Sequence, residues 1–250
     1  MASGSSGNCA LIATGRTRLL VDAGLSRKEI CARLNAIGQP PETIDAVLIS
    51  HEHSDHVAGL PVLAKHLKVP VYMTRLAAPG VAWNGCEPRL ETYQAGERLV
   101  IGDIEVDTFT VPHDAADPVG FCFHTQGIKA GFVTDLGYIP DSIKFHLRGC
   151  NLLVLESNHD LDMLKVGPYP WSVKQRVMGR KGHLSNAVAA DFIRRDLDAE
   201  PDTIVLAHLS ENNNHPALVE LSARQAVEAR GLKSTIVVAG RAEPTPVFCY

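Results

Sequence analysis

The chain has 250 residues, of which 45% are hydrophobic and 21% are charged, and its formal net charge is −4. This length and apolar content predict a single domain with a sizeable core, covering residues 1–250, and no apolar run is long enough to cross a membrane. The negative charge excludes an overall basic surface, so a nucleic-acid partner would need a local basic patch.

The first residues and the cysteines indicate the cellular compartment of the protein. The N-terminus has neither the basic nor the apolar block of a secretory signal, and the six cysteines form no CxxC pair. This pattern is typical of reduced thiols in a cytoplasmic protein, with no disulfide framework and no membrane partner.

The first third of the chain alternates predicted strands and helices. Two short apolar runs, residues 10–13 and 18–22, flank TGRT and predict a β-hairpin. A helix is expected over residues 26–38, because Ser26 and Glu29 fit a capping box and a glycine follows the last apolar position. Later elements are a buried strand at 45–50, a helix at 57–67 and a strand at 69–74.

A β-rich stretch follows, and strand–helix alternation then resumes. Residues 90–135 read as a series of short strands. The expected elements after it are strands at 151–156, 202–210 and 234–239 and helices Asn186–Leu197 and Pro216–Arg230. Two βα-rich halves flanking β-hairpins predict a sheet-on-sheet core with helices outside.

The stretch LISHEHSDHVAGL places four possible metal ligands within six positions: His51, His53, Asp55 and His56. Two imidazoles at i and i+2 suit one ion, and the following Asp–His pair suits a second. Neutral imidazole and carboxylate favour zinc, with iron, manganese or nickel as alternatives.

Three further ligand-type residues stand where predicted strands end: His113, Asp135 and His208. Each alone could be a polar residue that marks a strand end. All three together, beside an HxHxDH motif, are better explained as ligands that converge on one edge of a sheet.

This pattern resembles the metallo-β-lactamase superfamily over nearly the whole chain. The resemblance implies an α/β fold, a four-layer αβ/βα sandwich of two packed mixed sheets with helices on the outer faces. It also implies two divalent metal ions and a residue that orients the ligand loop from behind. The implied ligands are His51, His53 and His113 for one ion, Asp55, His56 and His208 for the other, and Asp135 as the bridge. The implied orienting residue is Asp22, for which a turn-capping role is the alternative.

Glu156 and His183 indicate which class of reaction this chain could catalyse. Glu156 ends the run LVLE and His183 precedes a predicted helix, as in RNase Z-like and PhnP-like phosphodiesterases, where such a pair assists phosphate chemistry. An imidazolium steadied by a carboxylate could protonate a leaving alkoxide, so His183 is the expected general acid. Asp55, His183 and Glu156 form the expected catalytic set; a helix-capping His with an unrelated Glu is the alternative.

Four short motifs together resemble the bacterial YycJ/WalJ branch of the superfamily: SGSSGN, ESNHD, GHLSN and AHLSENNN. Members of that branch are described as exonucleases that act on double-stranded DNA. The resemblance implies a dinuclear metal-dependent phosphodiesterase, most simply a DNA exonuclease, in which water activated by the two cations attacks phosphorus. DNA is favoured over RNA as the substrate.

A basic segment precedes His183. Residues 165–190 contain five basic residues, no acid, and the aromatic residues Tyr169 and Trp171. Basic side chains would hold phosphates and aromatic rings could stack on bases, whereas a solvated face with two core aromatics is the alternative. The expected substrate contacts are Lys174, Arg176, Arg180, Lys181, Asn158 and His159.

Two other functions stay open on sequence alone. One is a small-molecule hydrolase, either a cyclic phosphodiesterase or a glyoxalase-like thioesterase, because the chain lacks the large inserted domain of some nucleases with this fold. The other is a metal-stabilised binding module without catalysis, although a scaffold would not need a proton donor such as His183.

Overall fold

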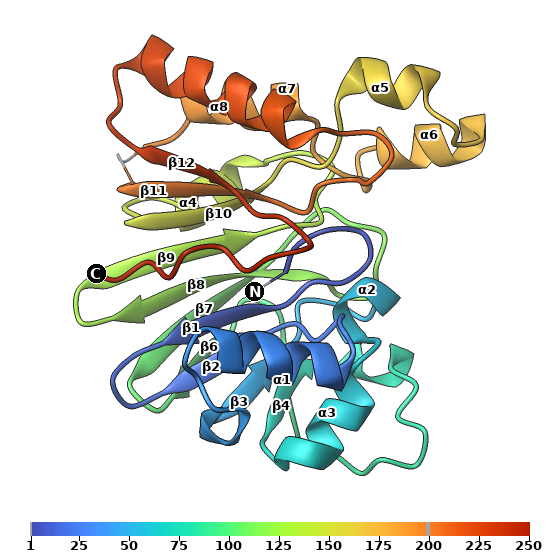
Figure 1. Ribbon diagram of the computed structural model, residues 1–250, viewed down its shortest axis with the longest axis vertical. Coiled ribbons are helices and arrows are strands. Elements are labelled where there is room, and N and C mark those ends of the chain that lie inside the picture. Colours follow the sequence, from blue (N-terminus) through green and yellow to red (C-terminus); the bar gives the residue numbers. More distant parts are fainter. Residues whose placement is uncertain (1, 199–200) are drawn as a thin grey trace. The chain divides into compact units, whose positions relative to one another are not determined.

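The computed structural model describes residues 2–198 and 201–250 (Figure 1). The described chain divides into two compact units. The first comprises Met1–Thr110, Ala115–Val119 and Arg241–Tyr250, and the second comprises Val111–Asp114 and Gly120–Gly240. The expectation of a single domain stays a prediction.

The first unit contains a five-stranded sheet in the order β1-β2-β3-β4-β5, in which β1 is antiparallel to β2 and the other neighbours are parallel. A hairpin of β6 and β7 completes its strands. The strands are β1 Ala10–Ala13, β2 Arg18–Val21, β3 Ala46–Leu48, β4 Val71–Thr74, β5 Leu90–Tyr93, β6 Arg98–Ile101 and β7 Ile104–Thr110. The helices are α1 Arg27–Ala36, α2 Ser54–Val57 and α3 Leu60–Leu67, with short 3-10 turns at Pro41–Thr43 and Ala78–Gly80.

The core of this unit explains why β3 can lead into a polar loop. All three residues of β3 are buried, and the apolar faces of α1 and α3 pack in the same cluster as the sheet. Ile30 and Leu34 supply the face of α1, and Leu60 and Leu63 that of α3. The strand is thus anchored in this core, which fixes the place where its polar continuation begins.

The second unit contains strands in the order β12-β11-β10-β9-β8, with β8 antiparallel to β9 and the rest parallel. The strands are β8 Val119–Thr125, β9 Ile128–Val133, β10 Leu152–Glu156, β11 Thr203–Ala207 and β12 Thr235–Val238. The helices are α4 Asp141–His146, α5 Leu161–Val166, α6 Trp171–Val177, α7 Asn186–Arg195 and α8 Pro216–Arg230. Because β9, β10 and β11 are parallel, the residues after their carboxyl ends meet at one edge of the sheet.

Most predicted elements are present, and the mixed sheets with their helices confirm the α/β class. The helix expected over 57–67 is wrong in its extent: it is two helices, because α2 begins inside the histidine motif and a new helix starts at Leu60. Pro61 in the first turn of α3 has no amide hydrogen and so cannot continue the α2 ladder. No helix among the described residues is both long and apolar enough to cross a membrane.

Two glycines let the backbone of the histidine loop lie close to residues near the N-terminus. A Cβ atom on Gly24 would lie 1.6 Å from the backbone oxygen of Asp55, and one on Gly59 would lie 1.8 Å from that of Leu25. The amide of Asn8 donates to the Asp55 oxygen at 2.8 Å, and that of Gly24 donates to the Asn8 oxygen at 2.9 Å. The loop is therefore held through its main chain.

Substitution of Gly24 by alanine should destabilise the protein through this contact. We expect Gly24→Ala to lower the free energy of unfolding by about 3 kcal/mol, because the new methyl group must displace backbone. Gly15→Ala is the matched control, since a Cβ there meets no atom within 4 Å. Urea denaturation of both variants measures the difference; equal midpoints would contradict the close approach at Gly24.

Candidate metal centre

The histidine loop of the first unit gathers its four predicted ligands around the start of α2. The rings of His51 and His56 are buried, with centroids 4.1 Å apart, and the rings of His51 and His53 are 4.6 Å apart. An oxygen of Asp55 lies 3.4 Å from Nε2 of His56. The motif therefore folds into a cluster of imidazoles and one carboxylate, a donor set compatible with a divalent cation.

Asp22 lies directly behind this loop. Its buried carboxylate accepts hydrogen bonds from the Ser50 amide at 2.8 Å, from the Ser50 hydroxyl, and from Nδ1 of His56 at 2.8 Å. A ring nitrogen that donates to a carboxylate leaves the lone pair on the other nitrogen, which is the form that binds a metal. The Ser50 hydroxyl also lies 3.0 Å from Nδ1 of His51, so both rings are oriented from one side.

Asn8 is a site residue to which the sequence analysis gave no role. Its amide nitrogen lies 3.1 Å from Nε2 of His56 and 3.2 Å from an oxygen of Asp55. Its side-chain oxygen accepts a hydrogen bond from the Gly4 amide at 2.9 Å. The motif SGSSGN is thus a turn that delivers an amide group to the ligand loop, and the motif itself was the signal for it.

Three candidate site residues have a left-handed backbone. Asp22, Asp135 and His208 have φ of 62°, 59° and 58°, and they are half of the six non-glycine residues with positive φ in the described chain. Each comes one or two residues after a strand, where the turn swings the side chain out of the strand's alternation. Such backbone is uncommon outside glycine and is typical of functional sites.

Glu156 is the centre of the second unit's cluster. It is fully buried, and its Oε1 accepts hydrogen bonds from Nδ1 of His183 and Nδ1 of His208, both at 2.8 Å. Its Oε2 accepts from the backbone amides of Leu136 at 3.1 Å and Leu184 at 2.9 Å. Burial would raise the pKa of this carboxyl, but the charge and hydrogen bond of His183, and those of His208, hold that pKa well below its usual range.

The sequence pairs Glu156 with His183 alone, whereas in the structure Glu156 orients His208 as well. His183 and His208 thus both present Nε2 away from Glu156. Burial would lower the pKa of His183, but the negative charge of Glu156 and its hydrogen bond outweigh burial and raise that pKa.

Asp135 and His113 lie beside this pair of histidines. An oxygen of Asp135 is 3.3 Å from Nδ1 of His208 and 3.9 Å from Nε2 of His113. His113 donates through Nδ1 to the backbone oxygen of Gly182 at 3.2 Å, which leaves its Nε2 as the ligand atom. Asp135, Glu156, His183 and His208 each offer one ligand atom within 4.8 Å of the others, so this cluster also fits a divalent cation.

The basic residues of segment 165–190 differ in their burial and partners. Lys174 is buried, and its ammonium group donates to the backbone oxygen of Lys165 at 2.7 Å, so it ties α6 to α5 and presents no surface charge. Arg176 is paired with Asp114, the neighbour of His113. Arg180 lies over the ring of Tyr138 at 4.3 Å from its centroid, and Lys181 is exposed.

Asn158 and His159 are also interior residues. Asn158 donates to the backbone oxygen of His208 at 2.8 Å, and His159 is 1% exposed. Neither side chain lies on the surface, and their contact with substrate stays a prediction; Asn158 also braces the left-handed turn at His208.

A buried amide network surrounds these two residues. Asn214 donates to the backbone oxygens of Ser157 and Asn158, each at 2.9 Å, and Asn186 donates to the side-chain oxygen of Asn214 at 2.8 Å. The network links the loop after β10, the start of α7 and the loop after β11. The asparagines in ESNHD, GHLSN and AHLSENNN were the sequence signal, but their partners could not be read from the sequence.

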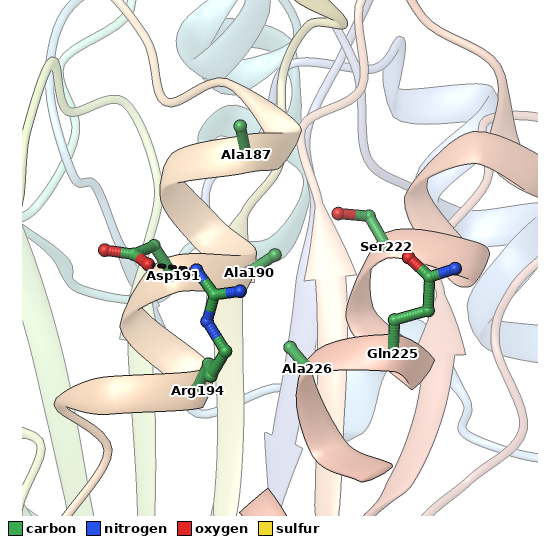
Figure 2. Close-up of a pocket in the computed structure, with 7 residues that line it drawn as sticks. All are labelled: Ala187, Ala190, Asp191, Arg194, Ser222, Gln225 and Ala226. Atoms are coloured by element: carbon green, nitrogen blue, oxygen red, sulfur yellow. Dashed lines mark hydrogen bonds and ion pairs between the residues drawn. The ribbon is translucent and has the colours of Figure 1, made fainter. Parts of the chain in front are cut away.

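A surface cleft between α7 and α8 shares no residue with the ligand clusters (Figure 2). Small side chains on both helices leave this space, and Arg194 at its rim pairs with Asp191 of the same helix at 2.6 Å. Its lining residues are Ala187, Ala190, Asp191, Arg194, Ser222, Gln225 and Ala226. None of them is a predicted ligand, so the cleft adds no chemistry to the centre.

The chain is similar to known proteins over most of its length. Residues 17–209 match the family described as Beta-lactamase superfamily domain. Exodeoxyribonuclease YycJ of Bacillus anthracis is 39% identical over 239 residues, covering 92% of this chain and 89% of that protein. Exodeoxyribonuclease WalJ of Streptococcus pneumoniae serotype 2 is 36% identical over 232 residues, covering 89% and 84%.

A solved structure shows the same fold. The metallo-beta-lactamase fold protein YhfI from Bacillus subtilis superposes with a TM-score of 0.73 at 19% identity. The match covers 96% of this chain and 93% of that one. At this identity the likeness shows the fold, while the sequence relatives show the branch.

Burial of His159 should make stability depend on pH. Desolvation lowers the pKa of His159 from 6.5 to about 4. Below about pH 6.5 the unfolded chain binds a proton at His159 that the folded chain does not bind, so protonation favours unfolding. The stability contributed by neutral His159 is therefore fully present above about pH 6.5 and is lost as the pH falls toward 4. Between pH 7.5 and 5 the loss should be about 2 kcal/mol.

The comparison of wild type with His159→Phe isolates this contribution. Urea denaturation across the pH range should show wild-type stability falling more steeply than that of the variant on the acid side. Parallel curves for the two proteins would mean that His159 takes up a proton in the folded state as readily as in the unfolded chain.

Proposed function

Because the chain belongs to the metallo-β-lactamase-fold family, in its YycJ/WalJ branch, we propose that this hydrolase is a metal-dependent nuclease that degrades DNA from an end. The single observation that carries the proposal is the pair of Glu156 and His183 beside Asp135 and His208. A carboxylate-held imidazole next to metal ligands is the arrangement that phosphodiester cleavage requires, because a nucleotide alkoxide must be protonated as it leaves.

The proposed centre is dinuclear. His51, His53 and His113 would hold one cation, Asp55, His56 and His208 the other, with Asp135 as the bridge. The donor chemistry fits zinc, and also manganese, iron or nickel. When bound, two such cations supply an acidified water as nucleophile and neutralise the phosphoryl oxygens.

In this proposal the protein's own residues orient the metal ligands and protonate the leaving oxygen. Glu156 fixes His183 through Nδ1 at 2.8 Å, so the proton delivered to the leaving oxygen would come from Nε2 of His183. The same carboxylate fixes His208, and Asp22 fixes His56, so both proposed ligands are set before substrate arrives. In this proposal Asp55 contributes as a ligand, and Glu156 acts through the two rings it orients.

Phosphate binding in the proposal rests on fewer basic residues than the sequence suggested. Arg180 and Lys181 are exposed and directly precede Gly182 and His183. Lys174 is buried and Arg176 is already paired with Asp114, so these two maintain the segment and are not offered as strand contacts. A strand held by Arg180 and Lys181 would pass next to the proposed acid.

The nuclease proposal is tested by comparing substrates. End-labelled single- and double-stranded DNA and RNA, bis-p-nitrophenyl phosphate and an S-acyl glutathione are offered to the protein with zinc or manganese. We expect stepwise shortening of DNA, its loss after chelation, and its return with added metal. Turnover of the thioester, with DNA intact, would instead identify a small-molecule hydrolase.

The role of His183 is tested by the leaving group. His183→Ala should reduce DNA hydrolysis by about a hundredfold or more, the scale of general acid catalysis. The reduction on bis-p-nitrophenyl phosphate should be much smaller, because p-nitrophenolate leaves without a proton. Elemental analysis should find close to two ions per chain in this variant and fewer in the matched His208→Ala.

Two outcomes would revise the assignment. Metal loss in His183→Ala, with His208→Ala fully loaded, would exchange the roles of the two histidines. An equal rate loss on both substrates with full metal content would mean that His183 stabilises phosphate oxygens and does not deliver the proton.

A further inference from the structure

Helices α5 and α6 expose several large apolar side chains to solvent. Among the described residues, fourteen large apolar side chains are conspicuously exposed, and four of them fall within residues 161–173. Val166 is 87% exposed and Trp171 is 62% exposed. We call this surface the stacking ridge, and it consists of Leu161, Val166, Trp171 and Val173. Exposing an indole ring forgoes its hydrophobic stabilisation, so a ring left in water points to a binding surface.

The ridge is held rigidly although it is exposed. The ammonium group of Lys174 crosses from α6 to the backbone oxygen of Lys165 at 2.7 Å, and Asp160 caps α5. Gly167, between the helices, packs so closely that a Cβ there would lie 2.3 Å from the side-chain oxygen of Asn213. A ring presented from a fixed frame loses little conformational freedom when it binds.

The ridge is joined to the catalytic residues through the end of α6. The amide of His183 donates to the backbone oxygen of Val177, the last residue of α6, at 2.9 Å. Trp171 and Val177 are six positions apart, which corresponds to about 9 Å along the helix axis. Since a stacked strand rises about 3.4 Å per nucleotide, this length of helix corresponds to about three nucleotides.

The charges around the ridge favour a nucleic-acid strand over a second copy of this chain. On α5, Asp162 pairs with Lys165 at 3.1 Å, so these two charges offset each other. No acidic residue occurs in 165–190, and the exposed Arg180 and Lys181 lie at the far end of α6 from Trp171. Self-association would bring Arg180 and Lys181 of two copies together, whereas a strand brings phosphates to these cations and a base face to the ring. Aromatic platforms beside basic residues are how proteins bind single strands without sequence preference.

We propose that Trp171 and the stacking ridge bind the unpaired bases of a strand end, so that the enzyme prefers single-stranded or frayed termini to blunt duplex ends. The proposal rests on the proposed nuclease function. It names a feature of the substrate that the metal centre itself does not select. Inside a duplex each base is stacked on both faces, and a blunt end offers only the outer face of its last pair. An end with several unpaired bases therefore offers the indole more faces on which to stack.

The test compares DNA duplexes with a four-nucleotide single-stranded overhang and blunt duplexes of the same sequence, using the metal-loaded enzyme. Wild type should have the higher kcat/KM on the overhang. Trp171→Ala should reduce this preference by about tenfold, whereas Trp171→Phe, which retains a ring, should keep it within about threefold. Phe145→Ala is the matched control and should leave the preference unchanged, because Phe145 is a 64% exposed aromatic residue on α4.

Fluorescence adds a readout that a structural role would not change. The chain has two tryptophans, Trp83 and Trp171. A phosphorothioate-linked oligothymidylate, which resists cleavage, should quench the emission of wild type. In Trp171→Phe the same strand should bind with little quenching, because only Trp83 remains.

Several results would overturn the proposal. These are a wild type without preference for the overhang, an unchanged preference in Trp171→Ala, and a loss that is equal on blunt and overhanging ends. A shift in oligomeric state of Trp171→Ala by sedimentation would identify the ridge as a self-association surface. If wild type cleaves no nucleic acid but hydrolyses bis-p-nitrophenyl phosphate, the nuclease function fails together with this proposal. In the other cases only the proposal for the ridge fails, and the proposed nuclease function is unaffected.

Discussion

The buried carboxylate of Glu156 is the interaction on which the second unit's centre depends. An ionised carboxylate without exposure is tolerated only when donors replace its water, and this one has four: two imidazoles and two backbone amides. The amides of Leu136 and Leu184 bring the segments after β9 and before α7 to the end of β10. Those segments carry Asp135 and His183, so one desolvated charge sets the positions of most residues in the cluster.

The first unit applies the same physics with different residues. Asp22 is buried, follows β2 in a left-handed turn, and accepts from Ser50 and from His56. In each unit a carboxylate at a strand end accepts a hydrogen bond from Nδ1 of a histidine and leaves Nε2 as the atom that could bind a metal. The left-handed backbone at Asp22, Asp135 and His208 is strain that these hydrogen bonds and the parallel strands hold in place. Rigid orientation of ligands therefore arises from the strand ends and not from the loops alone.

The sequence predicted those features that depend on chemistry within a few residues. HxHxDH, the polar residues at strand ends and the capping serine of α1 are local signals, and the predicted strands and helices around them are present. Long-range partners were out of reach: no spacing shows that Lys174 would turn inward to Lys165 or that Glu156 would hold His208. The break between α2 and α3 was also missed: the amide of Gly59 donates to the backbone oxygen of Ala23 at 2.9 Å, a partner that the sequence does not show.

The motif asparagines show why a buried polar network accompanies the centre. Amide groups inside a protein stabilise only when both donors and acceptor are satisfied, and Asn214 meets this by joining Ser157, Asn158 and Asn186. An apolar core would fill the same space but could not bind the backbone oxygens of Ser157, Asn158 and His208, which lie in two different loops. Because Asn158 in turn holds the carbonyl of His208, loop geometry is transmitted to a proposed ligand by directional bonds. The exposed ridge on α5 and α6 is anchored to the same loops, through the amide of Asp160 on the oxygen of Asn213. The proposed strand contact on α6 and the proposed ligand His208 would thus share one hydrogen-bonded frame.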